Sequence, residues 1–188
     1  FISGSPFADF AVLMASTAPE GSAEREISAF FVDLAAPGVE VVSGYKTMAG
    51  QSHTGDIHLN AVRVPVAHLI GEPGRGLGLA LGRITVNRLL HCPAMLGLAQ
   101  CALRDARDYA LSRQQFGRSI AQFQSIQHML ADMATEWMAA RALMVQTARA
   151  IDAGIDARAQ ASMSKLFCSE SAFRIADRAV QIHGGEGI

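Results

Sequence analysis

The most regular stretch of the sequence is IQHMLADMATEWMAARALMVQTARAI, residues 126–151. Mostly apolar residues recur along it at alternating intervals of four and three: Ile126, Leu130, Met133, Trp137, Ala140, Met144, Thr147 and Ile151. This spacing places them on one face of an α-helix and is typical of antiparallel helices packed in a bundle. The run Asp152-Ala153-Gly154 that follows favours a helix stop.

Helical periodicity continues on both sides of this stretch. In the preceding helix, one face is expected to carry Met95, Ala99, Leu103, Ala106 and Ala110. In the following helix, which ends near Gln181, the residues expected to face inward are Met163, Leu166, Phe173, Ala176 and Val180. The sequence therefore predicts most of an up-and-down helical bundle.

Residues up to about Leu69 have the pattern of a sheet, with short apolar runs broken by turn-forming residues. Strands are expected within residues 10–15, 27–34, 39–42 and 56–65. In the last of these, the alternation of Ile57, Leu59 and Ala61 slips phase at Val62, as it would at a β-bulge. The predicted fold class is thus α+β, a partial antiparallel β domain followed by an up-and-down helical bundle.

A glycine-rich link at residues 71–78 separates these two parts. Its segment GRGLG, residues 74–78, lacks the glycine spacing of a dinucleotide-binding loop, and no βαβ unit follows it. We therefore interpret the link as a flexible joint. The predicted domains are residues 1–72 and residues 73–188.

The composition excludes several classes of function. Half of the 188 residues are hydrophobic and 18% are charged, which suits a soluble globular chain. The formal net charge is −1 and no block of like charge could follow a phosphate backbone, so nucleic acid is not expected as a partner. No apolar run reaches the roughly 18 residues that cross a bilayer, so no membrane span is expected.

Disulfide and metal chemistry are also disfavoured. Cys92, Cys101 and Cys168 are odd in number and far apart, which fits neither a disulfide framework nor a zinc site. The six histidines show no metal-ligand spacing, so no metal is expected. The cysteines indicate a reducing compartment. Because the chain opens at Phe1 without an initiator methionine, any targeting segment is expected to lie outside it.

Two stretches are not explained by packing alone. In Ser112-Arg113-Gln114-Gln115-Phe116-Gly117-Arg118, a helix is expected to break at the glycine and to present a cation and an aromatic ring, with a new helix near Gln122. In the closing run QIHGGEG, residues 181–187, a helix ends and adjacent glycines leave backbone amides open to a ligand. Guanidinium and amide donors suit a phosphate ligand. Ordinary helix capping and turn formation remain the alternative.

Three segments resemble sequence motifs of the acyl-CoA dehydrogenase family. They are YALSRQQFG at residues 109–117, FQSIQHMLADM at 123–133 and AVQIHGG at 179–185, in the order in which the family has them. Phe1-Ile2-Ser3-Gly4 is similar to the family's aromatic-Ile-Ser/Thr segment. The resemblance implies the second part of the family's middle β domain followed by most of its C-terminal α domain, as an internal piece of a longer enzyme.

The resemblance also implies a set of FAD-binding residues. Arg113 would bind the diphosphate of an FAD that belongs mainly to a neighbouring subunit, and Phe116 would pack against its adenosine part. The same site would include Gln124, Gln181, Gly184 and Gly185. Phe1 and Ser3 would contact the flavin of their own subunit, and Arg88 matches an arginine near the acyl-CoA site. Gln115 departs from the threonine that most relatives carry.

The implied reaction is α,β-dehydrogenation of an acyl-CoA thioester, with a proton passing to a carboxylate base and a hydride to FAD. Asn87 stands where a minority of relatives carry the base, and the usual base is expected beyond Ile188. No catalytic residue is therefore assigned within the chain, and the isolated piece is expected to be inactive. Alternatives are an acyl-CoA oxidase or another flavin oxidase or monooxygenase, and a catalytically silent flavin-binding oligomer.

Family partners are implied in the same way. They are an acyl-CoA substrate, an electron-transfer flavoprotein as electron acceptor, and further copies of the chain in a homodimer or homotetramer. The implied location is the bacterial cytoplasm or the mitochondrial matrix.

Overall fold

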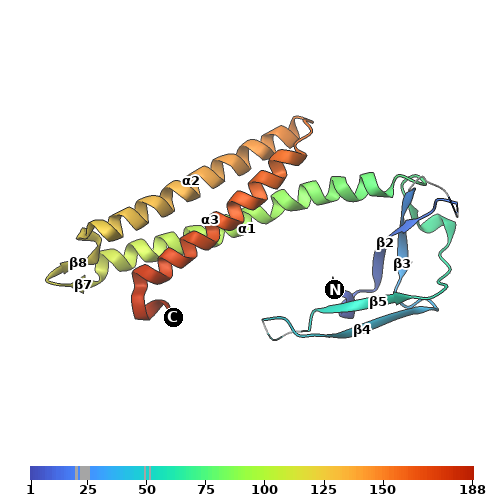
Figure 1. Cartoon of the computed structure of the whole chain (residues 1–188), viewed down its shortest axis with the longest axis horizontal. Helices are drawn as coiled ribbons and strands as arrows, with labels where there is room; N and C mark the ends of the chain where they lie inside the picture. Colours follow the sequence, from blue (N-terminus) through green and yellow to red (C-terminus); the bar gives the residue numbers. More distant parts are fainter. Residues whose placement is uncertain (20, 22–25, 49, 51) are drawn as a thin grey trace. The chain divides into compact units, whose positions relative to one another are not determined.

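The computed structural model describes residues 1–19, 21, 26–48, 50 and 52–188. They fold as two compact units, Phe1–Gly82 and Arg83–Ile188, and each unit is described by itself. The first unit is mainly β and the second mainly helical (Figure 1), so the predicted α+β class is confirmed.

Two small antiparallel sheets form the described part of the first unit (Figure 1). One has the strand order β1 (Ile2–Ser3), β5 (Thr54–Leu59), β4 (Val39–Tyr45). The other has the order β2 (Phe10–Ser16), β3 (Ile27–Asp33), β6 (Leu69–Ile70). Short 3₁₀ turns lie at Ser5–Phe7 and Val66–His68. The strands predicted within residues 10–15, 27–34 and 39–42 are confirmed, with their ends moved by one to three residues.

Side chains from both sheets line one interior cavity of about 200 Å³, and Val32 and Ile57 are among them. Val32 is almost completely buried. The apolar alternation seen in the sequence therefore marks the sides of the strands that share this interior.

The strand predicted for residues 56–65 ends earlier than expected. β5 stops at Leu59, and Ala61 has a φ of 49°, a left-handed conformation that no strand continues through. The expected bulge at Val62 is therefore wrong, because the change of phase marks the end of the strand. The irregular register lies between Ser43 and Tyr45 of β4.

The glycine-rich link is packed where a flexible joint was expected. Gly76 is the first residue of helix α1 (Gly76–Ser112), and a Cβ on it would lie 2.6 Å from the carbonyl carbon of Ser28 in β3. The amide of Gly74 donates a hydrogen bond to the Ser28 hydroxyl at 2.9 Å. Glycine is required at position 76 because the helix start lies directly against the backbone of β3.

Three long helices make up most of the second unit: α1 from Arg83 onward, α2 (Gln124–Asp152) and α3 (Arg158–His183). At one end of the unit Arg88 of α1 donates to Ser162 of α3, and at the other end the rings of Tyr109 and His183 stack. Helices α1 and α3 therefore run in the same direction and α2 returns between them in sequence, as in an up-and-down bundle (Figure 1).

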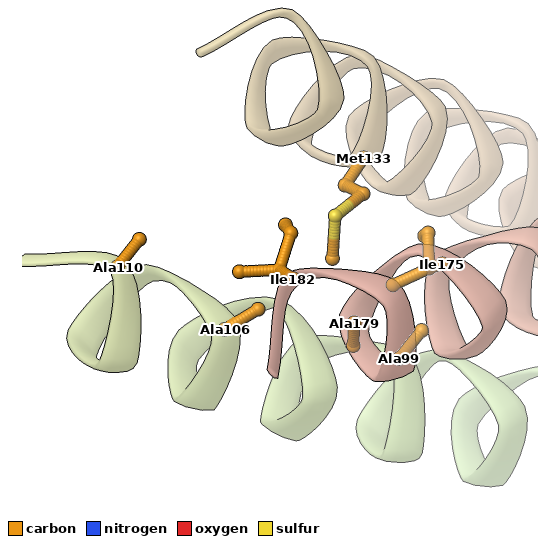
Figure 2. Close-up of a cluster of buried hydrophobic side chains, with 7 residues drawn as sticks. All are labelled: Ala99, Ala106, Ala110, Met133, Ile175, Ala179 and Ile182. Carbon is orange, nitrogen blue, oxygen red and sulfur yellow. The ribbon is translucent and has the colours of Figure 1, made fainter. Parts of the chain in front are cut away.

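The core of this unit uses the predicted faces of α1 and α2. Figure 2 shows buried side chains of α1, α2 and α3 pointing toward one another, and they are Ala99, Ala106, Ala110, Met133, Ile175, Ala179 and Ile182. The indole N–H of Trp137 donates to the backbone carbonyl of Leu96 at 3.1 Å, which ties α2 to α1. The spacing argument for these two helices is confirmed.

The predicted inward face of α3 is wrong. Its residues are exposed, with Leu166 at 61% and Phe173 at 73% of full exposure. The buried residues are Ala161, Ser164, Cys168, Ser171, Ile175, Ala179 and Ile182. Small and polar side chains are accepted there because they find partners, as the hydroxyls of Ser164 and Thr147 do at 2.8 Å. Hydrophobicity therefore does not mark the inward face of this helix.

The exposed face of α3 carries a stripe of large apolar residues, Met163, Leu166, Phe173 and Val180, which we name the α3 stripe. Leu166, Phe173 and Val180 are seven residues apart and so lie above one another on the helix. None of the described helices is long and apolar enough to span a membrane. Among the described residues, no group of three or more His, Cys, Asp or Glu side chains is placed to hold a metal ion.

Candidate functional site

A short β-hairpin connects α1 to α2. Strands β7 (Gln114–Gln115) and β8 (Arg118–Ser119) pair antiparallel, with Phe116 and Gly117 between them. Both of these residues have positive φ, 53° and 79°, which is the pattern of a type I′ turn. A 3₁₀ turn at Ile120–Gln122 follows, and α2 begins at Gln124. The sequence predicted a helix break at this glycine but not the hairpin.

Phe116 is strained and exposed at the tip of this hairpin. A left-handed conformation costs an L-residue with a side chain about 1 to 2 kcal/mol. The ring is nevertheless 90% exposed, and its nearest aromatic neighbour, Phe123, lies edge-on at 6.2 Å between centroids. Strained, exposed side chains held by a rigid turn are typical of functional sites. The hairpin thus leaves an aromatic ring available for contact with a ligand or another chain.

The closing glycine run folds back onto α3. The helix continues to His183, and a 3₁₀ turn covers Gly184–Gly187. The amide of Gly184 donates to the carbonyls of Val180 and Gln181, so this N–H is already used within the chain. A Cβ on Gly187 would lie 2.7 Å from the Val180 carbonyl oxygen, so Gly187 allows the close return of the chain. The expectation of open backbone amides is therefore wrong for Gly184.

The hairpin and the glycine run line one cleft of about 430 Å³, which we name the Arg113 cleft. Its walls are formed by Tyr109, Arg113, Gln115, Ile120, Ile182, His183, Gly184, Gly185 and Glu186. No atom of the described residues lies within 4 Å of a Cβ built on Gly184 or Gly185, so the backbone there borders open space. Three of the residues predicted from the sequence, Arg113, Gly184 and Gly185, are brought together here.

The remaining predicted residues of this set lie around the cleft. Gln181 lines an adjoining cleft of about 470 Å³ that shares Gly184 with the first. Gln124 is the exposed first residue of α2, and Phe116 is at the hairpin tip. These three side chains do not line the Arg113 cleft.

Arg113 supplies the positive charge of the cleft. Among the described residues, no ion pair involves its guanidinium. The carboxyl ends of α1 and α3 lie here with the amino end of α2, and each helix end acts as roughly half a charge. Among the residues that line the cleft, the Arg113 guanidinium stands against the Glu186 carboxylate and these helix ends, so it is the group of the cleft that attracts an anion.

Tyr109 and His183 are cleft residues for which the sequence predicted no role. Their rings stack with centroids 4.6 Å apart and an interplanar angle of 28°. They are far apart in the sequence, on α1 and α3, and no local spacing connects them.

Phe1 and Ser3 belong to the first unit. Phe1 is 85% exposed and its ring lies 4.8 Å from the ring of Tyr45, while Ser3 pairs with Thr54 of β5. The Tyr45 hydroxyl donates to the Asp56 carboxylate at 2.7 Å, and this hydrogen bond lowers the pKa of Asp56. The exposed aromatic ring thus lies beside a second ring and a carboxylate.

Arg88 lies at the opposite end of the second unit from Arg113. Its guanidinium donates to the Ser162 hydroxyl at 3.0 Å. With a rise of about 1.5 Å per helical residue, Arg88 and Arg113 are roughly 37 Å apart along α1. One small ligand cannot contact both side chains of the same chain.

Comparisons with known proteins identify the family of the chain. Residues 74–188 match the family model described as "Acyl-CoA dehydrogenase, C-terminal domain". The chain belongs to the acyl-CoA dehydrogenase family. This acyl-CoA dehydrogenase family member is 40% identical to the caffeyl-CoA reductase-Etf complex subunit CarC of Acetobacterium woodii, over 100% of the chain and 49% of that protein.

Solved structures of similar fold include members of the same family. Butyryl-CoA dehydrogenase from Megasphaera elsdenii is 32% identical to this family member with a TM-score of 0.87, over 100% of the chain and 49% of that structure. The structure of PigA with FAD and proline is 29% identical with a TM-score of 0.90, and the same shares, 100% and 49%, are covered. The chain thus spans about half the length of the relatives that it matches.

Proposed function

We propose that this acyl-CoA dehydrogenase family member takes part in flavin-dependent α,β-dehydrogenation of an acyl-CoA thioester, with FAD as the cofactor. The observation that carries the proposal is the Arg113 cleft, which a guanidinium without an ion-pair partner among the described residues lines together with Gly184 and Gly185. The names of two similar structures, a butyryl-CoA dehydrogenase and PigA with FAD, support the substrate class and the cofactor.

The residues of the cleft fit part of an FAD molecule. Arg113 offers paired N–H donors to a diphosphate, and the missing Cβ atoms of Gly184 and Gly185 leave room for it. The exposed ring of Phe116 would pack on the adenosine part, and Gln124 and Gln181 would border it from α2 and α3. When bound, FAD supplies the acceptor for the hydride.

We also propose that the Arg113 cleft binds the FAD of a neighbouring subunit. The resemblance assigns Arg113 to the FAD diphosphate and Arg88 to the acyl-CoA, and the two residues lie roughly 37 Å apart along α1, which supports their serving different active sites. Phe1 and Ser3 would contact the flavin of their own subunit. A homodimer or homotetramer is proposed with it, and the exposed α3 stripe offers an apolar surface for packing against a neighbouring subunit or against parts of the protein outside residues 1–188.

The residue that removes the α proton is proposed to lie outside residues 1–188. Asn87 cannot accept a proton. On α2, Glu136 is held by Arg174 and Arg178, each at 2.9 Å, and Asp132 pairs with Arg178 at 3.4 Å. These two carboxylates stabilise the α2–α3 contact, so we assign them no part in the proton transfer.

Three further proposals concern the surroundings of the chain. An electron-transfer flavoprotein is the proposed electron acceptor, because the relative from Acetobacterium woodii is named as a subunit of an Etf complex. The proposed location is the bacterial cytoplasm or the mitochondrial matrix, in keeping with the three free cysteines. Residues 1–72 and 73–188 are kept as the proposed domains, and the family match begins at residue 74.

The test is anaerobic titration of the full-length, FAD-loaded protein with acyl-CoA thioesters of increasing chain length. Loss of flavin absorbance with at least one thioester, followed by slow recovery when oxygen is admitted, is the expected result. Rapid recovery in oxygen would identify an oxidase. Retained FAD with no absorbance change for any thioester would identify a silent flavin-binding oligomer.

A further inference from the structure

The imidazole of His183 is held in one tautomer by the end of α3. Its Nδ1 atom lies 2.8 Å from the backbone carbonyl oxygen of Ala179. A carbonyl oxygen only accepts hydrogen bonds, so Nδ1 carries the proton and donates it. In the neutral ring, Nε2 then has a free lone pair and acts as an acceptor.

One other element contacts the ring, and a second lies beside the base of the side chain. Tyr109 of α1 stacks on it with centroids 4.6 Å apart and an interplanar angle of 28°. A Cβ on Gly187 would lie 3.2 Å from the Cβ of His183, so the closing 3₁₀ turn lies close beside it. The orientation of Nε2 is therefore set before any ligand binds.

A ligand of the Arg113 cleft would therefore need both hydrogen-bond acceptors and a hydrogen-bond donor. Arg113 can only donate hydrogen bonds, whereas Nε2 of a neutral, Nδ1-protonated His183 can only accept one. Glu186, on the same wall, adds a carboxylate that also accepts. A simple phosphate offers its oxygens mainly as acceptors and satisfies the guanidinium alone. A nucleotide offers phosphate oxygens together with hydroxyl and amino donors.

We propose that His183 is a further binding residue of the Arg113 cleft. Its Nε2 accepts a hydrogen bond from a hydroxyl or amino group of a nucleotide whose phosphates are bound by Arg113. His183 thereby selects a nucleoside diphosphate moiety over an inorganic phosphate. This inference rests on the proposed role of the cleft in binding FAD. It specifies that His183 contacts the nucleoside diphosphate part of that ligand.

Binding of FAD, ADP and pyrophosphate to the full-length apoprotein, measured by titration calorimetry, tests the inference. His183→Phe keeps a ring to stack on Tyr109 and removes Nε2. We expect it to weaken FAD and ADP binding about fivefold, the effect of one hydrogen bond, and to leave pyrophosphate binding unchanged. His183→Gln places an amide oxygen near the Nε2 position and is expected to restore most of the affinity.

Several results would overturn the inference. Unchanged FAD and ADP affinity in His183→Phe would refute it while leaving the proposed function standing, and an equal loss for pyrophosphate would show a merely structural role. A wild-type protein that does not bind FAD would remove the proposed function and this inference together. Long-range ¹⁵N–¹H NMR on the wild-type protein is expected to show the Nδ1-protonated tautomer, and an Nε2-protonated ring would also refute the inference.

Discussion

Arg113 follows the last turn of α1 and is fixed by its backbone rather than by an ion pair. Its amide donates to the Tyr109 carbonyl at 2.8 Å, and its carbonyl accepts from the Ile120 amide at 3.0 Å. The end of α1 and the 3₁₀ turn that precedes α2 therefore hold the residue from both sides. Because its position does not depend on its side chain, substitution of the side chain tests charge more than folding.

Arg113→Ala is expected to weaken FAD binding by roughly 10- to 100-fold, the effect of losing charge-assisted hydrogen bonds. The measurement is FAD retained by the full-length protein after dialysis, together with a titration of the apoprotein. Arg104→Ala is the matched control, because Arg104 pairs with the exposed Asp105 at 3.4 Å and does not line the Arg113 cleft. Equal retention in the two variants would contradict the assignment of Arg113.

Phe116 allows strain and binding to be separated. Phe116→Asn gives the turn an Asn-Gly sequence that accepts left-handed φ, so the apoprotein is expected to gain about 0.5 to 1 kcal/mol in its free energy of unfolding. FAD affinity is expected to fall because the aromatic ring is lost. Urea denaturation and FAD titration measure the two effects.

Phe116→Leu is the control for this substitution, since it removes the ring and keeps a side chain in the strained conformation. It is expected to lose FAD affinity without any gain in stability. If Phe116→Asn bound FAD as tightly as wild type, the hairpin tip would have no role in the flavin site.

The three cysteines are expected to differ in reactivity. Burial raises the pKa of the Cys168 thiol to about 12 and also raises that of Cys92, whereas Cys101 is exposed. At pH 8, a thiol reagent is therefore expected to modify Cys101 quickly and the other two only after denaturation. Fast modification of all three in the folded protein would contradict the packing of α1 against α3.

The same raised pKa values fix the sign of a pH effect. The unfolded chain loses its thiol protons near the ordinary value of 9.0, while the folded chain keeps that of Cys168 up to about 12. This contribution to stability is therefore complete below about pH 9 and is lost as the pH rises from there toward 12.

At the scale of elements, the predictions from sequence succeeded where mostly apolar residues mark a buried face. The four-and-three spacing identified the inward face of α2, and Ala99, Ala106 and Ala110 identified that of α1. The prediction from apolar spacing was wrong for α3, whose inward face includes Ser164 and Ser171. The sequence of a helix does not show which hydrogen-bonding partners other elements will offer to its polar residues.

The assignment of the buried and exposed faces of α3 can be tested by paired substitutions. Ile175 is completely buried, so Ile175→Ala is expected to lower the free energy of unfolding by about 2 to 5 kcal/mol at any protein concentration. Phe173 is on the opposite face, so the effect of Phe173→Ala is expected to depend on protein concentration through subunit contacts. Denaturation at two concentrations separates them. A larger, concentration-independent effect at Phe173 would restore the original prediction.

The hairpin between α1 and α2 was missed for a related reason. Type I′ turns favour Asn-Gly or Gly-Gly, and here the first central residue is Phe116. The prediction of a helix break at the glycine was correct. An aromatic residue is uncommon in a left-handed conformation, so the sequence did not indicate a β-hairpin there.

At the scale of the whole molecule, the α3 stripe is the feature that points beyond a single chain. Glutamates in place of Leu166 and Phe173 are expected to shift the full-length protein to a lower oligomeric state, because two charges would be buried at the contact. Light scattering coupled to size exclusion measures the mass. Lys165→Glu, at an exposed position on the same helix, is the control. An unchanged mass would exclude the stripe from the subunit interface.

The residues alone predicted a phosphate ligand at the Arg113 stretch and the closing glycine run, and the family resemblance assigned roles to single residues there. Arg113, Gly184 and Gly185 were assigned through motifs, and the structure brings them to one cleft. Tyr109 and His183 face each other across two helices, and their contact follows from the direct packing of α1 against α3. Such contacts depend on the register between helices, which no periodicity within either helix specifies.

Trp137 gives the bundle an optical reporter of its own. It is the single tryptophan in these residues, and its indole N–H is bound to the Leu96 carbonyl while its ring packs in the core clusters of the second unit. Separation of α2 from α1 would expose the indole to water and move its emission to longer wavelength. In a version of the protein where other tryptophans are replaced, fluorescence would follow the integrity of this one helix contact without reference to the flavin.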